Sequence, residues 1–279
     1  AFQSALQAEL TKGDSFAAAR QRAVAALLSP SDAALLSSPN NTLGIEYGRA
    51  LLRVGAAPAL FTIPRTGAAH DATPENAGGY SASAIRHLLA EGRRADALSR
   101  MVPAMRTVYE VEEAAGRAPV FAAACGRAIL ARLRSMTPAE FDALDTGHEG
   151  VGQRLYNASR NAATLDAVLD NAKTKRYAYA RLRRMVLWAY LGLSPAELPA
   201  SVPYLRVLAA NETGRALLGR MRKTARFPVI TKPAAIRSLS PDSQRLFETE
   251  SRAADLYALA YPELTEACGS LWRQNPVMP

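Results

Sequence analysis

The sequence predicts an α/β region followed by an α region, with a partial Rossmann-like domain over residues 1–105 and a mainly helical domain over residues 106–279. A short apolar segment, Ala59–Ile63, lies between a helical pattern and a polar loop. Helix signals are nearly continuous beyond Gly92. A chain of 279 residues also has room for two domains, because domains commonly span about 100–200 residues.

Three helices and one strand are expected before residue 66. Helical spacing of apolar residues, with Asp, Ser, Asn or Thr as caps, places two helices at about 14–28 and 41–52, and a short helical run between them ends near Leu36. Ala59–Ile63 is short, apolar and followed by Pro64, which indicates a buried strand. Ligands bind outside the carboxyl ends of strands in such sheets, so Arg65 is expected at the ligand edge.

Residues 66–80 are rich in Gly, Ala and Asn without periodicity, which predicts a mobile loop. Ser81 then caps a helix that runs to about Ala90. Ser81, Ser83 and Arg86 fall in its first turns, where a phosphate would receive backbone N–H groups, hydroxyls and a guanidinium. Taken alone, the pattern also fits an ordinary cap followed by an ordinary surface arginine.

The second region combines helices with two short strands. Thr137-Pro138-Ala139-Glu140 and Ser194-Pro195-Ala196-Glu197 are capping boxes with Pro at the first helical position. The expected helices are 119–136, 150–159, 164–171, one capped by Asn211, and 241–261; the expected strands are 204–208 and 228–231.

Positive charge is concentrated in one part of the chain. Between Lys173 and Arg237 there are 14 Lys and Arg against two acids, a net charge of +12, so the remainder carries −3 of the total of +9. Such a basic surface is typical of proteins that meet phosphates. Arginines on solvated helix faces are the alternative.

Residues 173–185 are expected to form a basic helix. At 100° per residue, Leu182 and Met185 share an apolar face, and the cations lie on the opposite face. A nucleic-acid backbone is the usual partner of such a face, whereas pairing with an acidic helix or simple solvation is the alternative. The predicted RNA contacts are Lys173, Lys175, Arg176, Arg181, Arg183 and Arg184.

The histidines and cysteines give no metal signature. The three histidines are scattered, and neither cysteine has a CxxC context, so no metal site is expected. His70, in the loop after Arg65, is the better site candidate; His87 is expected at the surface. No apolar run reaches the roughly 20 residues of a membrane span, and a cytoplasmic protein without membrane partners is expected.

Several segments together resemble the tRNA(Met) cytidine acetate ligase family of the nucleotidyltransferase superfamily, over nearly the whole chain. They are Pro39-Asn40-Asn41-Thr42-Leu43-Gly44-Ile45-Glu46-Tyr47, Arg65 with Gly67 and His70-Asp71, Ser81-Ala82-Ser83-Ala84-Ile85-Arg86, Glu149-Gly150, Lys173-Thr174-Lys175-Arg176-Tyr177, Pro203-Tyr204-Leu205-Arg206-Val207-Leu208, Pro228-Val229-Ile230-Thr231-Lys232 and Ala254-Asp255-Leu256-Tyr257.

The resemblance implies an enzyme that uses ATP to activate acetate as acetyl-adenylate and transfers the acetyl group to N4 of the wobble cytidine of elongator tRNA(Met). Asn40 and Arg65 match the family's ATP-binding Asn and Arg. Ser81, Ser83 and Arg86 match the second phosphate motif, with Ser83 where Thr is usual. Mg²⁺ is expected through the nucleotide, and no catalytic base is assigned.

The family's N-terminal motif of the type Glu-Tyr-Asn-Pro-Phe-His-x-Gly-His has no match in this sequence. This departure predicts a fragment that is inactive alone and whose N-terminal segment is a separate partner. A tRNA-binding module with a vestigial nucleotide edge, or a small-molecule adenylyltransferase of the same superfamily, are the alternatives. The basic region argues against the small-molecule enzyme.

Overall fold

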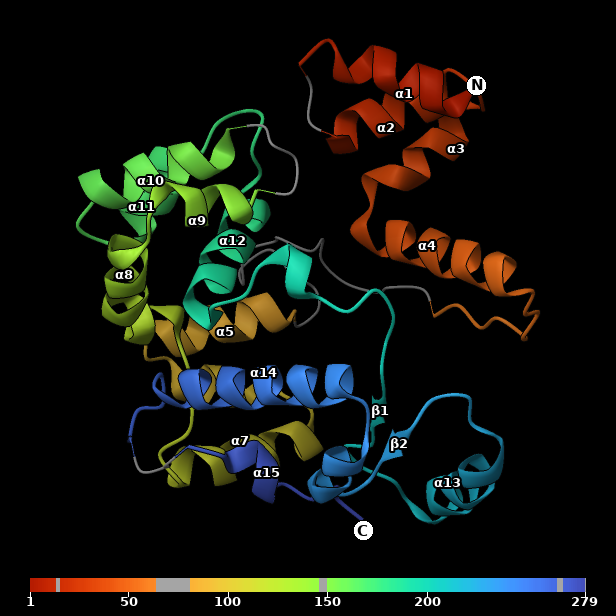
Figure 1. The fold of residues 1–279 in the computed structure, drawn as a ribbon, viewed down its shortest axis with the longest axis vertical. Coiled ribbons are helices and arrows are strands. Elements are labelled where there is room, and N and C mark those ends of the chain that lie inside the picture. The colour runs from red at the N-terminus through yellow and green to blue at the C-terminus, as the bar shows by residue number, and fades with distance from the viewer. Residues whose placement is uncertain (14–15, 64–80, 146–149, 265–267, 279) are drawn as a thin grey trace. The chain divides into compact units, whose positions relative to one another are not determined.

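The structure is a computed structural model that describes residues 1–13, 16–63, 81–145, 150–264 and 268–278. The chain divides into two compact units, residues 1–66 with 172–182, and residues 67–171 with 183–279 (Figure 1). Each unit is described by itself below.

The first unit contains helices α1 to α4. α1 packs against α2 and α2 against α3, and Ala19, Ala23 and Ala33 are buried. Arg22 of α2 pairs with Glu9 of α1 at 3.7 Å. The bounds are α1 Phe2–Leu10, α2 Phe16–Ala25, α3 Pro30–Ala34, η1 Leu35–Ser37 and α4 Pro39–Val54.

Helix α4 begins at Pro39, before the expected start at Asn41 or Thr42. Pro39 occupies the first turn, where a missing N–H costs nothing, and the preceding Ser38 is extended. The helix ends at Gly55, whose φ of 66° is the left-handed conformation that favours glycine at this position.

The expected strand at Ala59–Ile63 is wrong. These residues form no strand, and residues 57–63 make no backbone hydrogen bond to any other described residue. Leu60, Phe61 and Ile63 are 70%, 92% and 93% exposed. Apolar, strand-like composition predicts burial only when a neighbouring strand is present to pair with it.

The second unit is mainly helical. The bounds are α5 Ala82–Ala90, α6 Arg94–Ser99, α7 Pro103–Ala114, η3 Ala122–Cys125, α8 Gly126–Ser135, α9 Pro138–Ala143, α10 Val151–Asn161, α11 Leu165–Ala172, α12 Tyr179–Leu191 (which starts in the first unit), η4 Pro195–Glu197, α13 Glu212–Thr224, η5 Pro233–Ser238, α14 Pro241–Ala258 and α15 Ser270–Arg273. Within the described residues, no helix combines the length and the hydropathy that a membrane span requires.

A close-packed group of helices surrounds Phe141. Phe141, Leu133 and Leu155 are fully buried, and the Phe141 and Tyr156 rings meet edge to face at 5.6 Å. The expected helix 119–136 is shorter than predicted, because only a 3₁₀ turn precedes Gly126. Both expected capping boxes are present, although the second opens a 3₁₀ turn only.

Two parallel strands form a small sheet, β1 Leu205–Arg206 and β2 Val229–Ile230. The sequence predicts a strand at each of these places, over longer ranges, but not their pairing. Leu205 N donates to Pro228 O at 2.8 Å, and Val207 N donates to Ile230 O at 2.9 Å. The strands are anchored by a hydrophobic cluster of Tyr204, Ile230, Ile236, Phe247 and Leu271.

The expected continuous helix 173–185 is wrong in its first half. α11 ends at Ala172 and α12 begins at Tyr179, with a bent segment between them. Thr174 Oγ1 accepts hydrogen bonds from the backbone N–H groups of Arg176 and Tyr177, both at 3.2 Å. Such local side-chain bonds compete with the helical pattern.

Candidate nucleotide and nucleic-acid binding site

The first turns of α5 bring Ser81, Ser83 and Arg86 together. Ser81 is the N-cap, and its Oγ accepts a hydrogen bond from Ala84 N at 3.1 Å. One of the Arg86 guanidinium nitrogens donates to Ser83 Oγ at 3.3 Å, and the Arg86 side chain is exposed. Hydroxyl, guanidinium and helix N-terminus therefore form one cationic, hydrogen-bonding corner.

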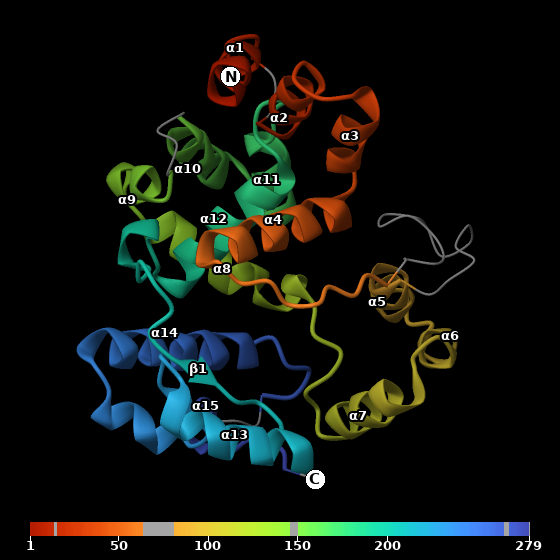
Figure 2. The same ribbon diagram turned by 90° about the vertical axis from the view of Figure 1, so that its right-hand side faces the viewer.

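A hydrophobic cluster holds this corner in place. Ile85 and Leu88, on the inner face of α5, pack with Ala97, Leu98 and Met101. Figure 2 shows α5, α6 and α7 following one another along one side of the second unit. His87 lies on the outer face of α5, as expected, and its Nε2 is 3.0 Å from Glu91.

A salt bridge joins α6 to α7. Arg94 Nε donates to Glu113 Oε2 at 2.8 Å, and this hydrogen bond lowers the pKa of the Glu113 carboxyl. Tyr109 Oη also donates to Glu113 at 3.2 Å, while burial raises the pKa of that hydroxyl.

Asn40 lies in the first turn of α4, exposed, and thus at a helix N-terminus like the Ser81 group. Arg20 of α2 reaches the same turn, because its guanidinium lies 3.5 Å from Thr42 Oγ1 and 3.6 Å from Glu46. No sequence pattern indicates Arg20, since its proximity to the first turn of α4 depends on how α2 packs. Asn40 and the α5 corner belong to different units, and Arg65 and His70 lie outside the described residues.

The predicted RNA contacts fall on two structural segments. Lys173, Lys175 and Arg176 belong to the bent segment, whereas Arg181, Arg183 and Arg184 belong to α12. Arg183 and Arg184 are exposed, while Leu182, Met185, Val186 and Ala189 on the opposite face are buried, as the helical pattern predicts for α12.

Aromatic rings accompany three of these cations. Lys173 Nζ lies 5.7 Å from the Tyr179 ring centroid, and the Arg181 and Arg184 guanidiniums lie 5.7 Å from the rings of Tyr177 and Trp188. Cation–π contact orients a cation without neutralising its charge.

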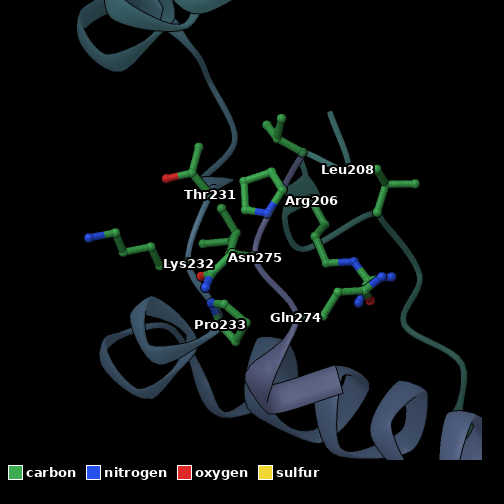
Figure 3. Close-up of a pocket in the computed structure, with 10 residues that line it drawn as sticks. Arg206, Leu208, Thr231, Lys232, Pro233, Gln274 and Asn275 are labelled. Carbon is green, nitrogen blue, oxygen red and sulfur yellow. The ribbon is translucent and has the colours of Figure 1, made fainter. Parts of the chain in front are cut away.

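A small cavity lies between the ends of β1 and β2 and the C-terminal segment (Figure 3). Arg206, Lys232, Gln274 and Asn275 are among its lining residues. Its volume of about 20 Å³ is suited to about one water molecule, far below what a nucleotide requires. An open cavity of about 620 Å³ elsewhere in the unit is lined by both carboxylates and guanidiniums, including Glu197 and Arg252.

Tyr204, Glu250 and Arg206 form a polar chain at the small cavity. Tyr204 Oη donates to Glu250 Oε2 at 2.9 Å, and Arg206 lies 4.0 Å from the same oxygen. Burial, with the Glu250 hydrogen bond, raises the pKa of Tyr204 well above its usual range. The sequence marked 204–208 as a strand but gave no role to this chain. The described residues hold no cluster of three or more potential metal ligands.

Comparison with known proteins identifies the class. The family model described as HIGH Nucleotidyl Transferase matches residues 1–270. The chain is thus a nucleotidyltransferase-type protein, and the expected fold class is confirmed.

The names of similar proteins point to a particular family within this class. The tRNA(Met) cytidine acetate ligase of Acetivibrio thermocellus is 31% identical over 99% of this chain and 70% of its own length, and that of Caldanaerobacter subterraneus is 33% identical over 93% and 65%. Apo Thermotoga maritima TmcAL superposes with a TM-score of 0.91 at 26% identity, covering 99% of this chain and 70% of that one; its crystal form with alpha-thio ATP gives 0.90. This chain belongs to the tRNA(Met) cytidine acetate ligase family.

Proposed function

We propose that this chain supplies nucleotide- and tRNA-binding parts of an enzyme that acetylates N4 of the wobble cytidine of elongator tRNA(Met) with ATP and acetate. The names of its relatives support the reaction, and the T. maritima structure with alpha-thio ATP supports a nucleotide site. The observation that carries the proposal is the α5 corner, where the Arg86 guanidinium donates to Ser83 at a helix N-terminus.

Asn40, Arg65, His70, Ser81, Ser83 and Arg86 are proposed to bind the nucleotide, and Mg²⁺ is proposed to bind through its phosphate oxygens, as it usually does. An acetate oxygen attacks the α-phosphorus and pyrophosphate leaves, which gives acetyl-adenylate. Cytidine N4 then attacks the acyl carbon, and AMP leaves as the amide forms. The Arg86 guanidinium and the α5 N–H groups stabilise the negative charge that develops on phosphate oxygens.

The cations at 173–184 are proposed to bind the phosphate backbone of the tRNA. Such contacts position the RNA without reading its sequence. The cytidine has to leave the stacked anticodon loop to react, as RNA-reading proteins usually require. Further parts of the proposal are a cytoplasmic location and a boundary between the two domains near residue 105.

The proposal is tested by titrating the chain with alpha-thio ATP. Arg86→Gln is expected to weaken binding about tenfold or more, because a charge-assisted phosphate contact is lost. Arg106→Gln is the control, since this exposed arginine pairs with Glu110 at 3.1 Å outside the corner. Equal affinities of the two variants would contradict the assignment of the α5 corner.

RNA binding and chemistry have their own tests. Reversing the charges of Arg176, Arg183 and Arg184 is expected to lower tRNA affinity; unchanged affinity rules out this RNA surface. Acetate- and tRNA-dependent AMP release by the full-length enzyme distinguishes the ligase from a binding module or a small-molecule adenylyltransferase.

We also propose that residues 1–279 act with a further part of the enzyme, on the same polypeptide or as a separate chain. The exposed segment Leu60–Ile63 supports this, because its apolar side chains and unpaired backbone groups are available to pair with a strand from another part of the enzyme. The chain alone is expected to show no ATP–pyrophosphate exchange, and exchange at a rate similar to that of the whole enzyme would contradict this part.

A further inference from the structure

Helix α13, which connects β1 to β2, carries an unbalanced positive charge. Residues 206–232 contain seven Lys and Arg against one acid, Glu212, a net charge of +6 out of the chain's +9. Figure 1 shows α13 set apart from α14 and α15 and joined to β1 and β2 by extended segments. The helix buries none of its residues.

The cations of α13 share one side of the helix. With 100° per residue, Arg215, Arg220, Arg222 and Lys223 fall within an arc of about 160° opposite Met221. All four are exposed, whereas Met221 and Leu218 are half-buried. The half-buried side chains thus lie on one face of the helix, and the other face presents guanidinium and ammonium groups to solvent.

These cations have no acidic partners among the described residues. No described carboxylate lies within 4.0 Å of Arg215, Arg220, Arg222, Lys223 or Arg226. Exposed arginines elsewhere do find carboxylates: Arg93 pairs with Asp96 at 2.8 Å and Arg106 with Glu110 at 3.1 Å. Compared with these two arginines, α13 and the residues just after it concentrate several cations without carboxylate partners in one short segment.

The helix dipole explains only part of this charge. Arg222 and Lys223 lie in the last turn, where cations stabilise the negative end of a helix. Arg215 and Arg220 lie outside that turn and gain nothing from it. Five like charges within the twelve residues from Arg215 to Arg226 repel one another at low ionic strength unless an anion lies beside them.

We propose that α13 is a second RNA-binding surface, which contacts the phosphate backbone through Arg215, Arg220, Arg222, Lys223 and Arg226. Guanidinium groups suit phosphates because they donate two parallel hydrogen bonds. Arg215 and Arg222 are two turns apart, about 10.5 Å along the axis, so they reach different phosphates of one strand. The inference rests on the proposed function and adds a surface distinct from residues 173–184.

The test uses the full chain and a tRNA(Met) transcript, with the dissociation constant measured by fluorescence anisotropy across a KCl series. The triple variant R215Q/R220Q/R222Q is expected to bind roughly tenfold or more weakly near 0.1 M KCl, with the slope of log K against log[KCl] reduced by about 2 to 3. Replacing the same three residues by Lys should retain most of the affinity and of the slope.

The matched control removes three charges from ion-paired, exposed arginines: R93Q/R106Q/R245Q. Its affinity is expected to stay within about threefold of the unmodified chain. Circular dichroism establishes that each variant is folded. An unchanged salt slope in the α13 triple variant would overturn the inference and leave the proposed function standing. Equal binding of poly-glutamate and RNA would also overturn it, because α13 would then bind an acidic protein.

Two further outcomes separate the inference from the function. No RNA binding by the unmodified chain overturns both. RNA binding that depends on α13, together with a full-length enzyme that releases no AMP with acetate and tRNA, supports the inference and contradicts the ligase.

Discussion

The Tyr204 hydroxyl donates to Glu250 at 2.9 Å while the Tyr204 side chain is only 5% exposed. Burial and this bond both favour the protonated phenol, which is why its pKa is raised. A raised pKa of an acid contributes stability that is fully present below the unfolded-state pKa of about 10. That stability is lost as the pH rises through the folded-state pKa.

Tyr204→Phe is expected to lower the free energy of unfolding by about 1–2 kcal/mol near pH 8, because a hydrogen bond to a charged group is removed. Above about pH 10 the difference from the unmodified chain should shrink, since the phenol then ionises in the unfolded state. Urea unfolding followed by circular dichroism, near pH 8 and above pH 10, measures this difference in the free energy of unfolding. Tyr257→Phe is the control, as Tyr257 is 56% exposed, and an equal loss in both variants would argue against a special role of the Glu250 bond.

The hydroxyl of the half-buried Tyr190 also has a raised pKa. Burial, with the nearby Cys125 thiol, raises the pKa of Tyr190 to about 12. Its hydroxyl lies 3.8 Å from Cys125 Sγ and donates to Leu256 O at 3.4 Å. The raised pKa values of Tyr190 and Tyr204 therefore both stabilise the fold at neutral pH. Loss of this stability at alkaline pH is expected to begin near pH 10.

Site residues were predictable where a local pattern decides their position. Ser81 as N-cap follows from its place before an apolar helical run, and Ser83 and Arg86 then share a turn by spacing alone. Arg20 and the Tyr204–Glu250 pair could not be predicted, because they join segments 22 and 46 residues apart. The nucleotide and RNA roles of all these residues stay predictions.

At the scale of elements, helix positions were predicted well and two extended or bent segments were not. Capping boxes and Asn211 mark helix starts through bonds within four residues. The Lys173–Ala178 segment carries helical composition, but Thr174 bonds locally instead. Strand formation at Ala59–Ile63 depends on a partner, which no local pattern can supply.

The approach of α10 to α9 depends on Gly152. A Cβ at this position would lie 2.6 Å from the Phe141 carbonyl oxygen and 2.9 Å from its carbon, and both belong to backbone. Gly152→Ala is therefore expected to lower the free energy of unfolding by about 1–3 kcal/mol. The measurement is urea unfolding by circular dichroism.

Gly219→Ala, in the interior of α13, is the matched control in the same unit. A Cβ there meets nothing within 4 Å. Alanine should stabilise this helix by about 0.5–1 kcal/mol, because glycine loses more backbone entropy on folding. If both substitutions changed the free energy of unfolding in the same direction, steric contact with Phe141 would not be the cause of the Gly152 effect.

At the scale of the whole molecule, the family and fold class were predictable because motifs are spread along the chain, and both are confirmed. The expected division near residue 105 stays a prediction. The structure's two units are discontinuous in sequence, since residues 172–182 belong with 1–66. Such a grouping is set by long-range packing and leaves no mark in local composition.

The exposed apolar segment allows a test at this scale. Phe61→Ser with Ile63→Ser is expected to change the free energy of unfolding by less than about 0.5 kcal/mol, because both side chains are more than nine-tenths exposed. Leu88→Ser, at a fully buried position, is the contrast and should cost more than about 3 kcal/mol. A large loss in the double variant would mean that residues 61 and 63 are packed in solution.

Leu60–Ile63 also has a consequence for handling the protein. An apolar stretch with free backbone donors and acceptors is a template to which a second molecule can add a strand. Self-association is expected to rise with protein concentration and to fall when Phe61 is replaced by Lys, as sedimentation velocity would show. Affinities measured at micromolar and at higher concentrations of this chain then refer to different species, and a dilution series belongs beside every titration.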